Sequence, residues 1–154
     1  MKNIKILVLL FLFCPSIVFS SEFQGVVNRV LDGDTIEVLQ GNNPVRVRLA
    51  NIDAPEKKQP FGTWSTNQLK SLVAGKLVKV TYTQTDRYGR VLGDVETRYI
   101  NVNRTQVISG AAWVYEHYNK DKALPAIQRE AQMQSRGLWA DSQPVPPWEW
   151  RHNK

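Results

Sequence analysis

Three short segments in the first half of the chain have the residue pattern of β-strands. Phe23–Leu31 is rich in valine, and polar and apolar residues alternate along Thr35–Leu39 and Val45–Leu49. Two turn-forming segments, Asp32-Gly33 and Gly41–Pro44, separate them. A repeat of two residues puts every second side chain on the same face of a strand. The three segments therefore predict an antiparallel meander.

The second half of the chain mixes helical and strand patterns. Thr63–Ala74 has apolar residues near a 3.6-residue period and is followed by a glycine, which predicts a helix. Leu77–Tyr82 and Val91–Val95 predict two further strands, whereas Ile100–Ser109 and Ala123–Ser135 predict helices. Five strands with about three helices favour an α+β fold that is mainly β: a small closed barrel of the OB type.

The beginning of the chain is typical of a secretory signal peptide. A basic start precedes the unbroken apolar run Ile6–Phe13, and small residues allow cleavage before Ser21. An uncleaved membrane anchor is the alternative, but this run is shorter than the ~20 residues that a membrane span prefers. We expect a signal peptide at 1–20, a single domain at 21–154, and a secreted or periplasmic product with no stable membrane association.

Composition excludes several kinds of site. Cys14 is the only cysteine and lies in the predicted leader, so the mature chain has no disulfide, zinc–thiolate site or thiol nucleophile. The two histidines, His117 and His152, are too far apart to form a zinc-ligand motif. The full chain has a net charge of +6, which falls to +4 without Lys2 and Lys5 of the predicted leader, and this mild excess suits a polyanionic partner.

The C-terminal tail, residues 143–154, is rich in proline and tryptophan. Its prolines prevent it from continuing the preceding helix. Trp148 and Trp150 either dock on the body of the domain or stack on nucleic-acid bases. Docking is favoured because large aromatic side chains usually bury their area.

Two carboxylates lie where neighbouring strands of the meander meet. Asp34 lies just after the first turn and before the strand that starts at Thr35, and Asp53 lies at the end of the third strand. Each has an ordinary explanation, hairpin chemistry for Asp34 and strand termination for Asp53. Together, two close carboxylates repel unless a cation lies between them, and Ca²⁺ accepts carboxylate and backbone carbonyl oxygens. The carbonyl of Ala54 is a further available ligand.

Two arginines and a glutamate complete a pattern that suits phosphodiester cleavage. Arg48 is expected to face away from the valines beside it, and Arg90 follows a Tyr-Gly turn. Guanidinium groups can bind a phosphate and stabilise a five-coordinate phosphorus. Glu56, held by Pro55, can orient or deprotonate water. Taken singly, these are also ordinary surface arginines and a solvated loop acid.

These motifs, in this order and spacing, resemble the thermonuclease family, the staphylococcal nuclease homologues. The likeness covers nearly all of the chain after the leader, and the aromatic tail is similar to that of bacterial members. Ala54 stands where family members often have Thr, a change that a backbone-carbonyl ligand tolerates. The resemblance rests on Val27–Val38, Val47–Leu49, Ile52–Glu56, Asp86–Arg90, Val102-Asn103, Gly110–Tyr115 and Gly137–Trp139.

This resemblance implies an OB-fold barrel and a calcium-dependent endonuclease that hydrolyses DNA and RNA to 3′-phosphate ends. It implies that Asp34, Asp53 and the Ala54 carbonyl hold Ca²⁺. It makes Glu56 the general base for the attacking water. It further implies that Arg48 and Arg90 bind the scissile phosphate and that Tyr88 contacts a nucleotide, with Tyr115 and Tyr118 as additional candidates.

A non-catalytic nucleic-acid-binding module on the same barrel is the main alternative. Such a module is expected to lose catalytic carboxylates or arginines, whereas all five are present here. An exported interaction domain is a third possibility, one that predicts no dependence on metal or nucleic acid. We expect DNA and RNA as substrates, preferably single-stranded or loosened duplex, and a monomer, since nothing in the sequence requires an oligomer.

Overall fold

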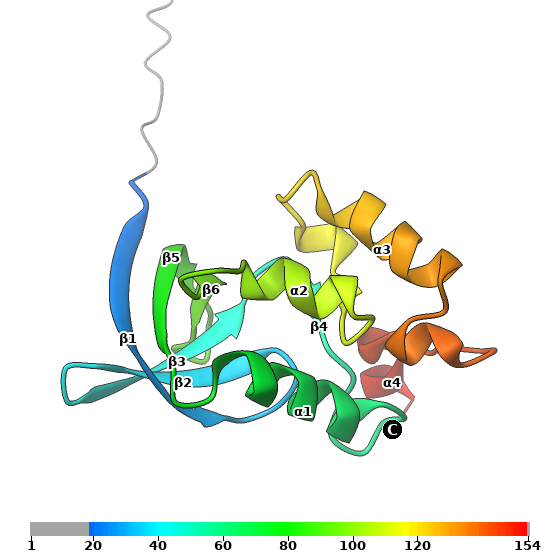
Figure 1. Ribbon diagram of the computed structural model, residues 1–154, viewed down its shortest axis with the longest axis horizontal. Helices are drawn as coiled ribbons and strands as arrows, with labels where there is room; N and C mark the ends of the chain where they lie inside the picture. The colour runs from blue at the N-terminus through cyan, green and yellow to red at the C-terminus, as the bar shows by residue number, and fades with distance from the viewer. Residues whose placement is uncertain (1–18, 154) are drawn as a thin grey trace, which may run out of the picture.

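The computed structural model describes residues 19–153 and places a β-barrel beside a group of helices (Figure 1). The barrel takes up one side of the molecule, and α2, α3 and α4 gather on the other. Residues 1–18 of the predicted signal peptide lie outside the described residues. Within the described part, no helix is both long and apolar enough to cross a membrane.

Five strands close into a barrel in the order β1-β2-β3-β6-β5, with β5 returning to pair with β1. The β3–β6 pairing is parallel and the other pairings are antiparallel. This mixed closed barrel confirms the predicted OB-type fold. The barrel strands are β1 (Ser21–Val30), β2 (Thr35–Gln40), β3 (Asn43–Leu49), β5 (Leu77–Thr85) and β6 (Val91–Glu96), and β4 (Ile52–Asp53) pairs separately with β7 (Trp113–Val114).

Residues 19–153 contain four α-helices, one more than the sequence patterns predicted. The additional helix lies in the tail, where Pro147 begins a new helix because a proline is tolerated in the first turn. Two short 3₁₀ segments, η1 and η2, connect the last helices. The elements are α1 (Gly62–Val73), α2 (Val102–Ile108), η1 (Glu116–Tyr118), α3 (Leu124–Met133), η2 (Gly137–Ala140) and α4 (Pro147–His152).

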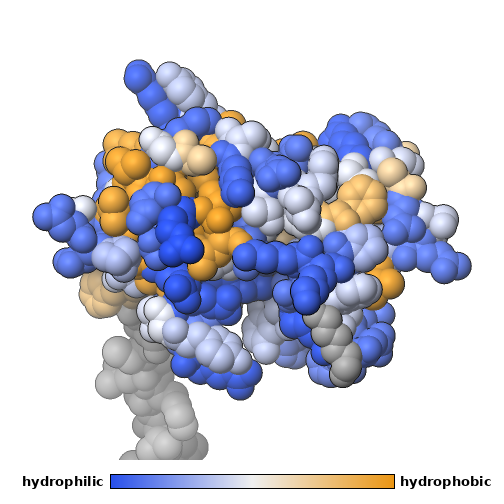
Figure 2. All heavy atoms as spheres, turned by 90° about the horizontal axis from the view of Figure 1, so that it is seen from below, coloured by the Kyte–Doolittle hydropathy of each residue, from blue (hydrophilic) through white to orange (hydrophobic). Residues whose placement is uncertain are grey.

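The core explains why these patterns fold as they do. Alternate residues of the strands, such as Ile36, Val38 and Val47, are fully buried inside the barrel. Leu69 and Val73 of α1 belong to the same cluster, so that the helix covers one end of the barrel. On the face shown in Figure 2, apolar residues gather mainly toward the barrel side and are bordered by hydrophilic ones.

The tail docks on the body of the domain, as predicted. The Trp148 ring stacks on Tyr115 at 5.4 Å and 9°, and meets Trp113 edge-on at 5.7 Å. The Gln59 side chain donates a 2.7 Å hydrogen bond to the carbonyl of Val145. These contacts place α4 beside the loop that follows β4 (Figure 1).

Candidate active site

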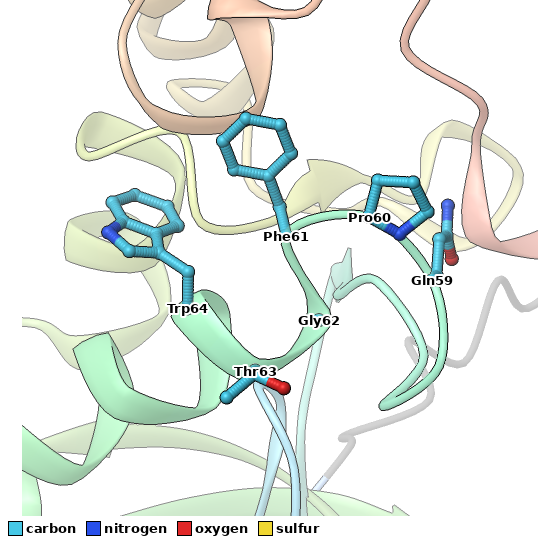
Figure 3. A pocket seen from close by; sticks show the side chains of 6 residues that line it. All are labelled: Gln59, Pro60, Phe61, Gly62, Thr63 and Trp64. Atoms are coloured by element: carbon cyan, nitrogen blue, oxygen red, sulfur yellow. The ribbon is translucent and has the colours of Figure 1, made fainter.

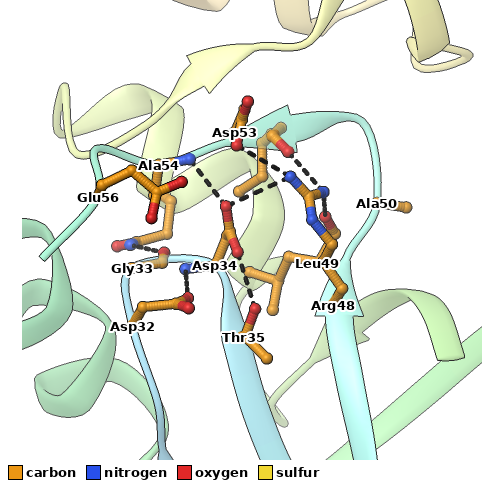
Figure 4. Close-up of polar contacts among 12 residues, drawn as sticks. Asp32, Gly33, Asp34, Thr35, Arg48, Leu49, Ala50, Asp53, Ala54 and Glu56 are labelled. Carbon is orange, nitrogen blue, oxygen red and sulfur yellow. Dashed lines mark hydrogen bonds and ion pairs between the residues drawn. The ribbon is translucent and has the colours of Figure 1, made fainter. Parts of the chain in front are cut away.

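The β2–β3 register brings the first site residues together. Thr35 pairs with Arg48, and the amide of Leu49 donates to the carbonyl of Asp34 at 2.8 Å. Asp53 follows a tight turn after β3, on the short strand β4. Asp34 and Asp53, which are 19 positions apart in the sequence, therefore lie at the same end of the barrel (Figure 4).

Arg48 is held by four acceptors. Its Nη2 lies 3.0 Å from Oδ1 of Asp53 and 3.5 Å from Oδ2 of Asp34. Its Nη1 donates to the carbonyls of Ile52 at 3.0 Å and Leu49 at 3.4 Å. Figure 4 shows the guanidinium extending from β3 to the two carboxylates. The arginine thus offsets the repulsion that the sequence analysis identified between the acids.

Asp34 is buried, with 6% of its surface exposed. Its Oδ2 accepts a 2.8 Å hydrogen bond from the amide of Ala54, and its Oδ1 accepts one of 2.9 Å from the Thr35 hydroxyl. Burial opposes ionisation, but the Arg48 charge and these hydrogen bonds hold the pKa of Asp34 below its usual range. Asp34 is therefore a carboxylate, the form that can hold a hard cation.

Asp32 is a site neighbour that the sequence reasoning did not single out. Its Oδ1 accepts a 3.0 Å hydrogen bond from the Asp34 amide. Burial, together with the nearby Asp34 charge, raises the pKa of Asp32 to about 7. The two aspartates of Asp32-Gly33-Asp34 were the available signal. Asp32-Gly33 was interpreted as a turn, so the interaction between Asp32 and Asp34 was not predicted.

Asp53 has 1% of its surface exposed and is bound by two arginines. Besides Arg48, Arg151 of α4 reaches it, with Nη2 2.7 Å from Oδ2 and Nη1 3.3 Å from Oδ1. Burial raises the pKa of Asp53 and the nearby Asp34 charge raises it further, whereas the hydrogen bonds from Arg151 lower it. The net result is a pKa above the usual range for Asp. Arg151, 98 residues away in sequence, was missed because nothing local marks it.

Glu56 lies on the loop after β4 and meets the same arginine. Its Oε1 accepts a 2.9 Å hydrogen bond from Nη1 of Arg151, while its own amide donates to Oε1 of Gln59 at 3.0 Å. The Glu56 side chain is 39% exposed, so it is accessible to water. In Figure 4 the side chain points toward Asp34. A fixed yet accessible carboxylate can accept a proton from water.

Arg90 lies in the turn between β5 and β6. Its Nε donates to Oδ2 of Asp86 at 2.8 Å, and its guanidinium lies 5.5 Å from the centre of the Tyr88 ring. The described contacts do not join Arg90 to Arg48 or the acids. Tyr88 is exposed, as a nucleotide contact would need to be.

The other two tyrosine candidates lie near the tail. Tyr115 and Tyr118 meet edge-on at 4.9 Å. Tyr115 is half-buried because Trp148 stacks on it, whereas Tyr118 is exposed. Tyr118 therefore has the more accessible ring of the two.

Metal-binding capacity rests on the two aspartates. Within residues 19–153, no group of three or more His, Cys, Asp or Glu side chains forms a metal-binding cluster. The predicted set needs only two carboxylates, Asp34 and Asp53, and a backbone carbonyl. These carboxylates converge on a single guanidinium nitrogen, and their oxygen chemistry fits a hard cation such as Ca²⁺.

An open pocket elsewhere on the surface does not contribute to this chemistry. It lies at the start of α1, where the Phe61 and Trp64 rings meet at 6.0 Å and 90° (Figure 3). None of the predicted catalytic or metal-binding residues lines it. Its lining residues are Gln59, Pro60, Phe61, Gly62, Thr63 and Trp64.

Comparison with known proteins agrees with this geometry. A sequence model of the family described as "Staphylococcal nuclease homologue" matches residues 46–141. The chain belongs to this family. A relative from Escherichia coli, named "Uncharacterized endonuclease", is 61% identical over 138 residues, which cover 89% of this chain and 90% of the relative.

Two further relatives extend the comparison to other bacteria. "Micrococcal nuclease" of Shigella flexneri is 42% identical over 142 residues, covering 85% of this chain and 82% of the relative. An "Uncharacterized endonuclease" of Haemophilus influenzae is 42% identical over 129 residues, covering 83% and 72%. The resemblance seen in the sequence is confirmed, and this staphylococcal nuclease homologue is a hydrolase that cleaves phosphodiester bonds.

Proposed function

We propose that this nuclease is an exported, calcium-dependent endonuclease that hydrolyses DNA and RNA and leaves 3′-phosphate ends. The observation that supports it most strongly is the convergence of Asp34 and Asp53 on Arg48, with the accessible Glu56 carboxylate on the adjoining loop. This arrangement supplies, in one region, oxygen ligands for a cation, hydrogen-bond donors for the substrate phosphate and a carboxylate that can accept a proton.

Asp34, Asp53 and the backbone carbonyl of Ala54 would hold the cation. Bound Ca²⁺ would act as a Lewis acid that neutralises charge on the phosphate. The residues themselves prepare the place for it. Arg48 and the Ala54 amide fix the Asp34 carboxylate in its ionised form before any ligand binds.

Glu56 accepts the proton of the attacking water, or orients that water, because its carboxylate is fixed yet accessible. The water oxygen bonds to phosphorus in line with the departing 5′-oxygen, whose bond to phosphorus breaks. The 5′-oxygen takes up a proton and leaves as a hydroxyl, and the phosphate stays on the 3′ side. Arg48 and Arg90 donate hydrogen bonds to the phosphate oxygens as negative charge accumulates there.

Substrate binding follows from charge and exposed aromatic rings. Without Lys2 and Lys5 of the leader the net charge is +4, and this positive charge attracts the phosphate backbone irrespective of base sequence. The exposed rings of Tyr88 and Tyr118 can stack on bases of single-stranded or loosened duplex substrates. Charge attraction and aromatic stacking both act on DNA and RNA alike.

The proposed location is the periplasm or the medium, and it rests on the basic and apolar start of the sequence. Fractionation of the producing cells, with N-terminal sequencing of the active protein, tests it. We expect a mature chain that begins at Ser21. An active cytoplasmic protein that still begins at Met1 would contradict this part of the proposal.

Cleavage of labelled single-stranded DNA and RNA by the purified protein tests the reaction. We expect endonucleolytic products with 3′-phosphates in Ca²⁺, and none after chelation. Products with 5′-phosphates, or undiminished cleavage in chelator, would overturn the corresponding part. Binding without cleavage would instead indicate a nucleic-acid-binding module.

Glu56→Gln examines the proton acceptor. The amide keeps the shape but cannot take up a proton, and we expect turnover to fall by roughly 10²–10⁴-fold with little change in DNA binding. The matched control is Glu130→Gln, an exposed acid on α3, which is expected to cleave at the normal rate. Near-normal turnover of Glu56→Gln would remove it from the reaction.

A further inference from the structure

Arg151, on the C-terminal helix α4, is the described residue that joins Asp53 to Glu56. Its Nη1 lies 2.9 Å from Oε1 of Glu56 and 3.3 Å from Oδ1 of Asp53. Its Nη2 lies 2.7 Å from Oδ2 of Asp53. One planar guanidinium thus binds two acids to which the proposed function gives different roles.

The anchoring of α4 makes this contact a built feature of the fold. Trp148, three residues before Arg151, is stacked on Tyr115 and packed against Trp113. The backbone just before α4 is tied to Gln59 through the Val145 carbonyl. Arg151 therefore extends from a helix fixed on two sides, which lowers the entropy cost of holding its fork in place.

The contact has two consequences for the acids. Arg151 is the only described side chain that hydrogen-bonds to the Glu56 carboxylate, so it sets the direction of that group. At Asp53, both oxygens already accept from guanidinium nitrogens of Arg48 or Arg151. A divalent cation that binds Asp53 must therefore either displace one of these donors or share a carboxylate oxygen with it. The positive charge of Arg151 repels such a cation.

We propose that Arg151 is a positioning residue of the active site, which orients Glu56 and competes with the cation for Asp53. The inference rests on the proposed roles of Glu56 and Asp53. The C-terminal helix is then part of the catalytic apparatus: it holds the proton acceptor in place and limits how tightly the cation binds.

Arg151→Ala and Arg151→Lys separate orientation from charge in the full-length mature protein. Calorimetric titration with CaCl₂ measures cation affinity without substrate, and steady-state cleavage of single-stranded DNA gives kcat and KM. For Arg151→Ala we expect Ca²⁺ to bind about tenfold more tightly, because a nearby positive charge is gone. We expect kcat to fall by about 10–100-fold, because Glu56 loses its orienting partner.

Arg151→Lys retains the charge but not the fork. We expect its Ca²⁺ affinity to stay within about twofold of the wild type while kcat remains lowered, since one ammonium cannot bind both acids as guanidinium does. Arg129→Ala is the matched control: it removes an exposed arginine from α3 and is expected to leave both quantities unchanged. Thermal unfolding of each variant checks that it is folded.

Unchanged or weaker Ca²⁺ binding by Arg151→Ala, or an unchanged kcat, would overturn the inference. Should the alanine variant fail to fold, Arg151→Met, which keeps the apolar stem, is titrated with CaCl₂ in its place. A wild-type protein that neither binds Ca²⁺ nor needs it would overturn the proposed function itself. A calcium-dependent wild type with an Arg151→Ala variant that behaves like Arg129→Ala would overturn only the role of Arg151.

Discussion

Arg48 and Arg90 are both expected to bind the phosphate, yet the protein holds them in different ways. Arg48 lies on barrel strand β3, with 14% of its side chain exposed; it donates to Asp53 and two backbone carbonyls and forms an ion pair with Asp34. Arg90 lies in the β5–β6 turn, with 26% of its side chain exposed, and its described partners are Asp86 and the Tyr88 ring of the same turn. Arg48 is thus part of the structure that forms the site, whereas Arg90 lies on a turn that the described contacts do not join to it.

This difference bears on what each residue can do for catalysis. An arginine held by four acceptors is oriented before the substrate arrives, so it gives electrostatic stabilisation without reorganisation. An arginine on a turn can move with the substrate, at the cost of ordering its side chain on binding. Removal of Arg48 should therefore affect both folding and turnover, and removal of Arg90 should affect turnover alone.

Arg48→Ala should have the largest effect. It leaves Asp34 and Asp53 buried without their shared partner, and loss of one member of a buried ion pair costs about 3–5 kcal/mol. We expect that loss in the free energy of unfolding, measured by urea denaturation, together with a loss of cleavage by orders of magnitude. Added Ca²⁺ should restore part of the stability, because a cation between the acids replaces the missing charge.

Arg46→Ala is the control for that experiment. Arg46 lies two residues earlier on β3 and is exposed, so its removal should change the free energy of unfolding by less than about 0.5 kcal/mol. If Arg48→Ala were as stable as Arg46→Ala, the buried network would not hold this end of the barrel together.

The barrel and half of the site could be predicted from the sequence because their information is local. Strand alternation predicted the barrel strands, and the spacing of the turns predicted that Asp34 lies near Asp53. Asp34 immediately precedes β2 and Arg48 lies on β3, so the β2–β3 register converts sequence distance into spatial distance, and Asp53 follows a short turn after β3.

The rest of the site depends on tertiary packing that no local pattern encodes. Arg151 reaches Asp53 only because Trp148 docks α4 on Tyr115, a contact between segments more than 30 residues apart. The raised pKa of Asp32 likewise follows from burial, which alternation does not measure. The proline-rich tail showed that a preceding helix must end, but not that a new helix would begin at Pro147.

Arg90→Ala should show the opposite balance from Arg48→Ala. We expect turnover to fall by roughly 10²–10³-fold, the usual cost of removing one donor to the transition state. The free energy of unfolding should change by no more than about 1 kcal/mol, because the ion pair with Asp86 is partly exposed. Arg87→Ala, in the same turn, is the control, and near-normal turnover of Arg90→Ala would remove it from the site.

Asp86→Asn examines the turn that holds Arg90, and its effect should be the smallest. Burial opposes ionisation, but hydrogen bonds from the amides of Arg90 and Tyr88 and from the Arg90 side chain lower the pKa of Asp86 in the folded protein below 3.8. Its carboxylate therefore stabilises the fold above pH 3.8, and this contribution disappears as the pH falls through the lower, folded-state pKa.

We expect Asp86→Asn to lower the free energy of unfolding by about 1 kcal/mol at pH 7 and by progressively less below pH 4. Urea denaturation of both proteins between pH 3 and pH 7 measures the difference. A gap that stays constant with pH would mean that the turn depends on hydrogen bonds that asparagine also forms, not on the charge of Asp86. The contrast with Arg48 would then sharpen, because only the buried arginine would contribute its charge to the stability of the fold.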